Sequence, residues 1–135
     1  MDLKKDGDMS LSINTILFSG RMDPVHPGHI ITIKRLLKKC QKVIVVMLDY
    51  PERRYPMAYC MDILKESLDG LPVEVIANNV HFGKITKKQL SEYDFDVYAT
   101  GNLIVLRHIE KLGIKVIYCD RAYLYEASKI PMPQE

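Results

Sequence analysis

Two histidines stand three residues apart in a stretch whose residue types suit phosphate binding, "GRMDPVHPGH" (residues 20–29). His26 and His29 are separated by Pro27 and Gly28, and the stretch directly follows the apolar run "TILF". Imidazole N–H groups can donate hydrogen bonds to phosphate oxygens whose negative charge grows during a displacement. The chemistry that these residues favour is therefore electrostatic stabilisation of a phosphate, with no nucleophile on the protein.

The histidines lie where a strand is predicted to end and a helix to begin. Residues 14–19 form a short apolar run, and Ile30, Ile33 and Leu37 recur at the spacing of one helical face. In an open parallel sheet, ligands bind at the carboxyl ends of the strands. The first turn of the following helix presents unpaired N–H groups. Gly28 lacks a Cβ, so it would let a ligand approach the backbone closely.

Apolar runs alternate with amphipathic stretches along the whole chain. The apolar runs occupy residues 14–19, 42–48, 73–77, 95–100 and 114–119. The amphipathic stretches occupy residues 29–40, 57–68, 86–93 and 103–112. This alternation is typical of a layered α/β domain. The sequence therefore predicts a Rossmann-like, three-layer α/β/α fold with a five-stranded parallel sheet. We expect residues 1–12 to form a polar, disordered leader and residues 13–135 to form a single domain.

The composition narrows the class of protein. Lys and Arg total 19 against 17 Asp and Glu, and this balance gives no field that would favour nucleic acid or an anionic membrane as a partner. Cys40, Cys60 and Cys119 are far apart and show no C-x-x-C spacing, which suits buried, reduced thiols. No apolar segment approaches the length of a membrane span. We therefore expect a cytoplasmic protein that binds neither nucleic acid nor a membrane.

At these residues the sequence resembles the nucleotidyltransferase superfamily, whose signature is H-x-G-H at the start of a helix. "GRMDPVHPGH" is similar to the "GRFxPxHxGH" of nicotinamide mononucleotide adenylyltransferases. It is also similar to the "GTFDxxHxGH" of glycerol-3-phosphate cytidylyltransferase and phosphopantetheine adenylyltransferase. The resemblance implies that both histidines contact the triphosphate. It implies a nucleotide-binding role for the residues around them as well: Gly20, Arg21, Met22, Asp23, His26, Gly28 and His29.

Two further segments extend the resemblance. "ATGN" (residues 99–102) matches a short glycine-containing loop that contacts the nucleotide, which implies a binding role for Gly101 and Asn102. "RAYLYEASKI" (residues 121–130) aligns with "RTEGISTTKI", whose arginine and last hydroxyl residue grip the phosphates. This alignment implies a catalytic and nucleotide-binding role for Arg121 and Ser128.

The sequence also departs from the family pattern at four positions, one of which is Pro131, where a basic residue is often found. Glu126 and Ala127 stand where the family prefers hydroxyl residues, and Cys60 stands where it commonly has an arginine. Arg53 and Arg54, in "DYPERRYPM", resemble a basic loop that meets substrate or phosphate in relatives, so they could compensate. The alternative is that the two arginines are charges on a solvated loop.

The loop "NNVHFGK" falls where the family shapes its acceptor pocket, which implies acceptor contacts for His81 and Lys84. The alternative is that these two residues are exposed loop residues with no ligand. Together with Arg53 and Arg54, they complete the set of side chains that we expect to bind the acceptor.

The resemblance implies transfer of CMP or AMP from CTP or ATP to a small phosphorylated acceptor, with release of pyrophosphate. Mg²⁺ would be the cofactor, held mainly by the triphosphate and not by protein ligands. We expect Asp23, the only carboxylate near the histidines, to cap a turn through backbone N–H groups. Small relatives commonly pair, so we also expect a homodimer or a larger homo-oligomer. Arg21 favours the adenylyl branch, whereas the short chain and the Arg121 segment favour the cytidylyl branch.

Two interpretations from other classes stay open. The departures at Cys60 and at residues 126–127 would suit a nucleotide-binding relative without catalysis, which would bind nucleotide and release no pyrophosphate. The H-x-G-H spacing also occurs in class I aminoacyl-tRNA synthetases, so the chain could be a fragment of one. Its length argues against that interpretation, and failure to bind tRNA would remove it.

Overall fold

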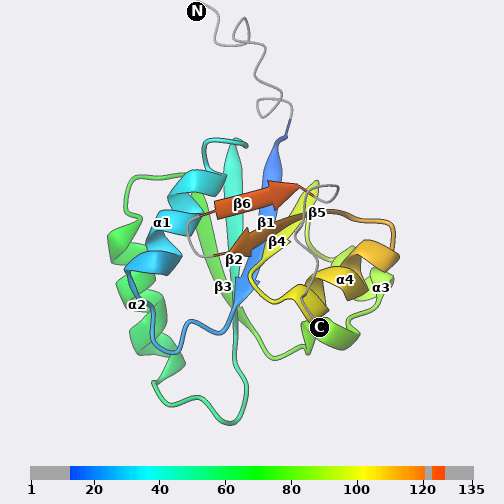
Figure 1. The fold of residues 1–135 in the computed structure, drawn as a ribbon. Coiled ribbons are helices and arrows are strands. Elements are labelled where there is room, and N and C mark those ends of the chain that lie inside the picture. Colours follow the sequence, from blue (N-terminus) through cyan, green and yellow to red (C-terminus); the bar gives the residue numbers. More distant parts are fainter. Residues whose placement is uncertain (1–12, 121–122, 127–135) are drawn as a thin grey trace, which may run out of the picture.

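The computed structural model describes residues 13–120 and 123–126, and it consists of one sheet between two layers of helices (Figure 1). In chain order the elements are β1 (Thr15–Gly20), α1 (Pro27–Leu36), β2 (Lys42–Leu48), α2 (Met57–Ser67), β3 (Val73–Asn78), η3 (Phe82–Lys84), α3 (Lys87–Leu90), β4 (Val97–Thr100), α4 (Leu103–Lys111), β5 (Lys115–Asp120) and β6 (Tyr123–Glu126). The strand order in the sheet is β3-β2-β1-β4-β5-β6.

The predicted α/β fold with its parallel sheet is confirmed, with one strand more than expected. Strands β1 to β5 all pair in parallel, and β6 pairs antiparallel with β5. Asp120 is the partner of Tyr123. So short a connection can join only antiparallel strands, because a parallel crossover needs a dozen or more residues. Strand β6 has only four residues, Tyr-Leu-Tyr-Glu, and this run is too short to distinguish a strand from other structure by its hydrophobic pattern.

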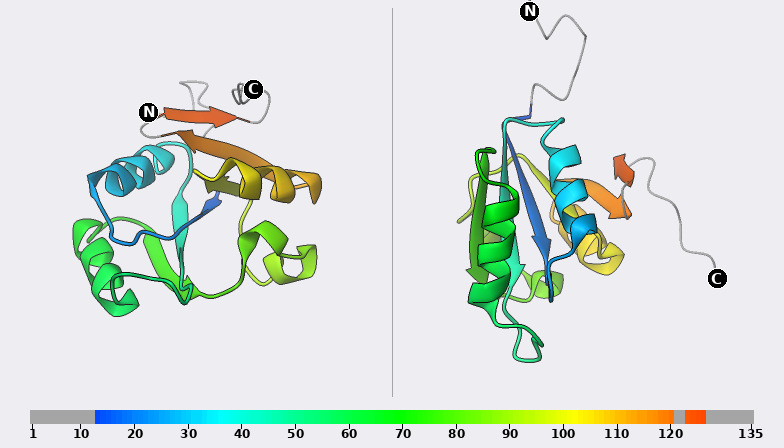
Figure 2. Two further views of the ribbon diagram at one scale, coloured as in Figure 1. Left: turned by 60° about the horizontal axis from the view of Figure 1, so that its bottom comes forward. Right: turned by 90° about the vertical axis from the view of Figure 1, so that its left-hand side faces the viewer.

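Each face of the sheet has its own apolar core. Val43, Val45 and Met47 of β2 belong to the core under α1 and α2, while Ile44 and Val46 belong to the core under η3, α3 and α4. The two helical layers are seen on opposite sides of the sheet in Figure 2. Because successive residues of a strand point to opposite faces, a strand buried on both sides must be apolar throughout. This requirement explains the unbroken run in β2.

Helix α1 packs on the sheet through the predicted face. Ile33 is fully buried, and Ile30 and Leu37 are partly buried against the same core. The helix ends at Leu36, earlier than the pattern to Cys40 suggested. Cys40 nevertheless packs into that core beyond the helix end.

All three cysteines lie in the core under α1 and α2. Cys40, Cys60 and Cys119 are buried and unpaired, as expected. Burial raises the pKa of the Cys40 thiol and raises that of Cys119 to about 12. The thiols of Cys40 and Cys119 therefore stay protonated and unreactive at neutral pH.

The strand order reverses between β1 and β4. The chain leaves β1 through α1 toward β2 on one side, and it leaves β4 through α4 toward β5 on the other. Ser19 of β1 pairs with Thr100 of β4, so the loops that follow these strands leave the sheet side by side. A crevice at such a switch point is where open α/β sheets bind ligands. None of the helices in residues 13–120 and 123–126 is long and apolar enough to cross a membrane.

Gly113 follows α4 in a backbone conformation that side chains rarely adopt. Its φ is +88°, and a Cβ added there would meet nothing within 4 Å. Gly113→Ala should therefore lower the free energy of unfolding by about 1 kcal/mol through backbone strain alone. Gly113→Asn should lose less, because Asn tolerates the left-handed region better. Urea unfolding of the two variants measures this, and equal stability of Gly113→Ala and the parent chain would contradict it.

Candidate active site

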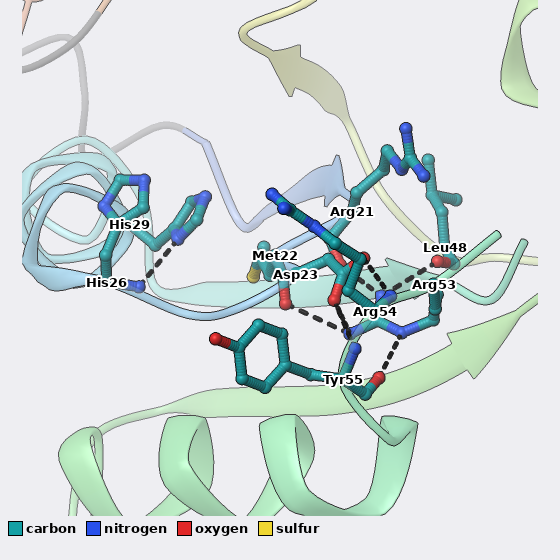
Figure 3. A network of polar contacts seen from close by, with 9 residues as sticks. All are labelled: Arg21, Met22, Asp23, His26, His29, Leu48, Arg53, Arg54 and Tyr55. Carbon is teal, nitrogen blue, oxygen red and sulfur yellow. Dashed lines mark hydrogen bonds and ion pairs between the residues drawn. The ribbon is translucent and has the colours of Figure 1, made fainter.

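The two histidines lie next to each other at the start of α1 (Figure 3), where they form a reciprocal cap. The N–H of Gly28 donates to Nδ1 of His26 at 3.1 Å, and the N–H of His26 donates to Nδ1 of His29 at 3.1 Å. The two rings stack with their centroids 3.9 Å apart. Imidazole nitrogens here do what a serine and a glutamate do in an ordinary capping box. The candidate site is therefore built on the first turn of helix α1.

These hydrogen bonds determine which ring nitrogens carry protons. Because each Nδ1 accepts a backbone N–H, a neutral His26 or His29 must carry its proton on Nε2. A donor that polarises one side of an imidazole also strengthens the donor on the other side. The N–H of Gly28, where we expected a ligand to approach the backbone closely, already donates to His26. The groups that the pair offers to a ligand are the two Nε2–H donors.

His29 is neutral at pH 7 in this structure. Burial, and to a smaller extent the adjacent His26, lowers the pKa of His29 from 6.5 to about 4. A phosphate placed against the ring would favour the protonated form and would raise this pKa. His29 is thus neutral before the ligand binds, and a ligand's negative charge would favour its protonation.

Gly28 is needed for a reason that the sequence did not show. A Cβ at this position would lie 2.8 Å from Cε1 and 3.0 Å from Nδ1 of His26. Such contacts are too close, so a side chain here would push the imidazole off the helix start. The close approach that Gly28 permits is that of the neighbouring histidine ring.

The loop between β1 and α1 makes a sharp turn at Met22. Its φ is +48°, in the left-handed region, and its side chain is 2% exposed in the core under α1 and α2. Asp23 follows, and its carboxylate accepts the N–H groups of Arg54 and Tyr55 at 2.7 Å each. The Arg54 N–H is the largest cause of a lowered pKa at Asp23. Asp23 thus binds backbone N–H groups, as expected, but those of the loop after β2.

The two adjacent arginines of that loop differ in how far their side chains are exposed to solvent. The Arg53 side chain is 5% exposed, and its guanidinium donates to carbonyl groups within the protein. The interpretation of Arg53 as a solvated charge is therefore wrong. Arg54 is exposed.

Three loops place aromatic and cationic side chains in a row along the carboxyl edge of the sheet. Arg21, after β1, holds its guanidinium carbon 5.6 Å from the ring centroid of Tyr50, after β2. Tyr50 in turn stacks on His81, after β3, at 5.8 Å. Lys84 lies exposed in η3, one turn further on. Tyr50 was not among the predicted site residues, although its position two residues beyond an unbroken apolar strand was a usable signal.

The loop after β4 is tied to β1. The Thr100 hydroxyl donates to the Ser19 carbonyl at 3.3 Å and accepts the Asn102 N–H at 3.2 Å. Oδ1 of Asn102 caps α4 by accepting two N–H groups of its first turn. A Cβ on Gly101 would lie 3.0 Å from the Cys119 carbonyl oxygen. Gly101 and Asn102 thus stand at the switch point beside Gly20, while the Asn102 oxygen serves the helix.

Other predicted site positions fall in different places. Arg121 and Ser128 lie outside the described residues, as does Ala127. Cys60 is fully buried in α2 as part of the core. Among the residues that the structure describes, no three His, Cys, Asp or Glu side chains gather to hold a metal ion.

Comparison with known proteins identifies the family. The model of the family described as cytidylyltransferase-like matches residues 17–121. The chain belongs to the cytidylyltransferase-like family. It is also 30% identical, over 117 residues, to a nicotinamide-nucleotide adenylyltransferase of Aeropyrum pernix, an alignment that covers 76% of this chain and 67% of the relative. The predicted membership of the nucleotidyltransferase superfamily is thereby confirmed, and nucleotidyl transfer is supported as the general activity of this family member.

The low pKa of His29 makes the stability of the folded protein depend on pH. An unfolded chain, with an ordinary histidine pKa of 6.5, binds a proton at this position more readily than the folded chain, whose pKa is about 4. This contribution to stability is therefore fully present above pH 6.5 and is lost as the pH falls toward 4. His29→Gln, which keeps an acceptor for the His26 N–H, should show a shallower acid loss. Urea midpoints between about pH 7 and pH 4 test this, and parallel curves would contradict it.

Proposed function

We propose that the protein transfers an adenylyl group from ATP to a phosphate group of a small acceptor and releases pyrophosphate. The observation that carries this proposal is the pair of Nε2–H donors on His26 and His29 at the start of α1, beside the switch point of the sheet. The similarity to the nicotinamide-nucleotide adenylyltransferase of Aeropyrum pernix supports ATP as the donor. Arg21, in "GRMDPVHPGH", supports the same branch.

The reaction needs little chemistry from the protein. An oxygen of the acceptor phosphate attacks the α-phosphorus of ATP, the new O–P bond forms, and the bond to the β-phosphate breaks with its electron pair going to pyrophosphate. The attacking oxygen is already anionic, so no general base is required. The two Nε2–H groups donate to phosphate oxygens whose charge grows, and the positive end of the α1 dipole adds to this.

Magnesium enters this proposal as part of the substrate. The nearest carboxylate, Asp23, is occupied by two backbone N–H groups and lies 4.0 Å from a nitrogen of Arg53, so it is a poor metal ligand. Mg²⁺ commonly keeps most of its waters and binds substrate phosphates directly. Bound to the triphosphate, it would neutralise part of the phosphate charge.

The acceptor is proposed to bind along the row of side chains from β1 to β3. Arg21, Arg54 and Lys84 are exposed cations on three successive loops, and His81 lies among them. Separate cations suit an acceptor that carries its own phosphate. Assembly into a homodimer or a larger oligomer remains a prediction, and the mass in solution tests it.

A non-catalytic nucleotide-binding protein is the second candidate, and one observation favours it. Cys60 is fully buried where relatives commonly have an arginine in this helix, so α2 offers no charge there. The family match over residues 17–121 favours either candidate over a fragment of an aminoacyl-tRNA synthetase.

A pyrophosphate-release screen tests the proposed function. Each of the four ribonucleoside triphosphates is offered with Mg²⁺ and a panel of phosphorylated sugars, alcohols and nucleotides. We expect release with ATP and one class of acceptor. A preference for CTP would overturn the choice of base, and tight nucleotide binding without release in any pairing would favour the non-catalytic candidate.

The histidine donors can be removed without removing the helix cap. His26→Asn and His29→Gln keep acceptors for the capped N–H groups, as Asn and Gln do in ordinary capping boxes. Each variant should keep its fold and lose roughly 10²- to 10³-fold in kcat, the usual cost of deleting one preorganised donor. The KM values should change less, because the contacts strengthen mainly in the transition state.

His108→Ala is the matched control for these two variants. His108 belongs to α4, away from the β1–α1 loop. The substitution removes an imidazole that contacts the Ile85 carbonyl oxygen. This change should lower the melting temperature and leave kcat near its parent value. Near-normal kcat in both folded His26 and His29 variants would show that transfer occurs elsewhere.

A further inference from the structure

We propose that Arg53 and Asp23 lock together the two loops that carry the site, and that Arg53 is a positioning residue and does not bind the acceptor. The loops are residues 21–26, between β1 and α1, and residues 49–56, between β2 and α2. We call the contacts between them the Arg53–Asp23 latch (Figure 3). The inference rests on the proposed function only in that its effect is measured in turnover.

Arg53 makes one half of the latch with its guanidinium. Nη1 donates to the carbonyl oxygens of Arg21 and Leu48, the latter at 3.2 Å, and Nη2 donates to that of Met22 at 3.1 Å. Nε donates to the carbonyl of Tyr55 at 3.2 Å. One side chain thus joins the end of β2 and its own loop to the loop after β1.

Asp23 makes the other half in the opposite direction. Its two carboxylate oxygens each accept one N–H of the second loop, that of Arg54 and that of Tyr55. Each loop therefore sends one charged side chain to the backbone of the other. The same two side chains approach each other, with Nη2 of Arg53 4.0 Å from Oδ1 of Asp23.

Burial separates the latch from an ordinary surface ion pair. The side chains of Arg53 and Asp23 are 5% and 8% exposed. Buried charges are stable only where hydrogen bonds satisfy them, and here backbone groups do so on both sides. Four of the five guanidinium N–H groups of Arg53 donate to carbonyl oxygens of the protein, and the side chain is only 5% exposed. An acceptor phosphate could therefore form a bidentate contact with this side chain only by breaking the latch. A lysine could not replace this planar fork, since its ammonium cannot reach several carbonyls in fixed directions.

The latch bears on the histidines through a short stretch of chain. The latch binds the backbone carbonyls of Arg21 and Met22 and engages the side chain of Asp23. This stretch of chain contains the left-handed turn at Met22. His26, the N-cap of α1, comes only three residues after Asp23. Holding this turn therefore sets where the helix start, and with it the Nε2–H donors, stands relative to the loop that carries Arg54. A misplacement of about 1 Å at a reacting group can cost roughly 10²-fold in rate.

Hydrogen exchange in the unmodified protein tests the latch directly. The N–H groups of Arg54 and Tyr55 lie in a loop outside any helix or strand, so only Asp23 accounts for their protection. Measured by NMR, these two amides should exchange at least about 10-fold more slowly than the neighbouring exposed Glu52, because exchange requires the latch to open. Asp23→Ala should abolish the difference. Equally fast exchange in the folded parent chain would overturn the proposal.

Kinetics then separate positioning from acceptor binding. Arg53→Lys and Arg53→Met should both lose roughly 10- to 100-fold in kcat with saturating substrates, while the KM for the acceptor changes little. Arg35→Lys and Arg35→Met, on the exposed side of α1, are the matched controls and should keep kcat. If Arg53 bound the acceptor, its lysine variant would keep much of kcat and raise this KM, which would overturn the proposal. A lower melting temperature with unchanged kcat would overturn it as well.

The two proposals fail in different ways. An active parent chain whose Arg53→Lys variant is equally active refutes the latch and leaves the proposed function standing. A parent chain that releases no pyrophosphate refutes the proposed function, and the protection of the Arg54 and Tyr55 amides then decides the latch alone. If the Arg53 variants do not fold, Asp23→Ala and the exchange data on the parent chain give the same decision.

Discussion

The hydrogen bonds from backbone N–H groups to Nδ1 of His26 and Nδ1 of His29 constrain everything else in this site. They place the protons on Nε2, bring the rings into a stack and leave no room for a side chain at Gly28. They also start helix α1 at this point, so the helix dipole and both donors coincide. The same hydrogen bonds therefore start the helix and orient the donors that would bind the ligand.

Much of the polar surface around the site is used by the protein itself. The N–H of Gly28, the carboxylate of Asp23, the guanidinium of Arg53 and Oδ1 of Asn102 all have partners within the chain. This use of polar atoms holds the loops after β1, β2 and β4 in fixed positions before any ligand arrives. A site of this kind stabilises charge without reorganising during the reaction, which is what electrostatic catalysis requires.

The sequence predicted the parallel sheet well, because unbroken apolar runs and the amphipathic stretches between them are local patterns. It also located the histidine pair, since residue types and spacing are enough for that. It could not distinguish Arg53 from Arg54. The two are identical neighbours, and which of them turns inward depends on carbonyl groups of Arg21 and Met22, about thirty residues away. The capping role of the imidazoles was equally hidden, because it depends on ring orientation.

The three cysteines have a practical consequence, because they all belong to one side of the molecule. Cys40, Cys60 and Cys119 lie in the core under α1 and α2, and the core under α3 and α4 contains none of the described cysteines. A thiol reagent can reach their sulfur atoms only when this layer opens. The rate at which each cysteine is alkylated therefore records how often the layer that carries the histidine helix separates from the sheet. The three native cysteines can thus report on local opening of the protein beside the site, and no label has to be introduced.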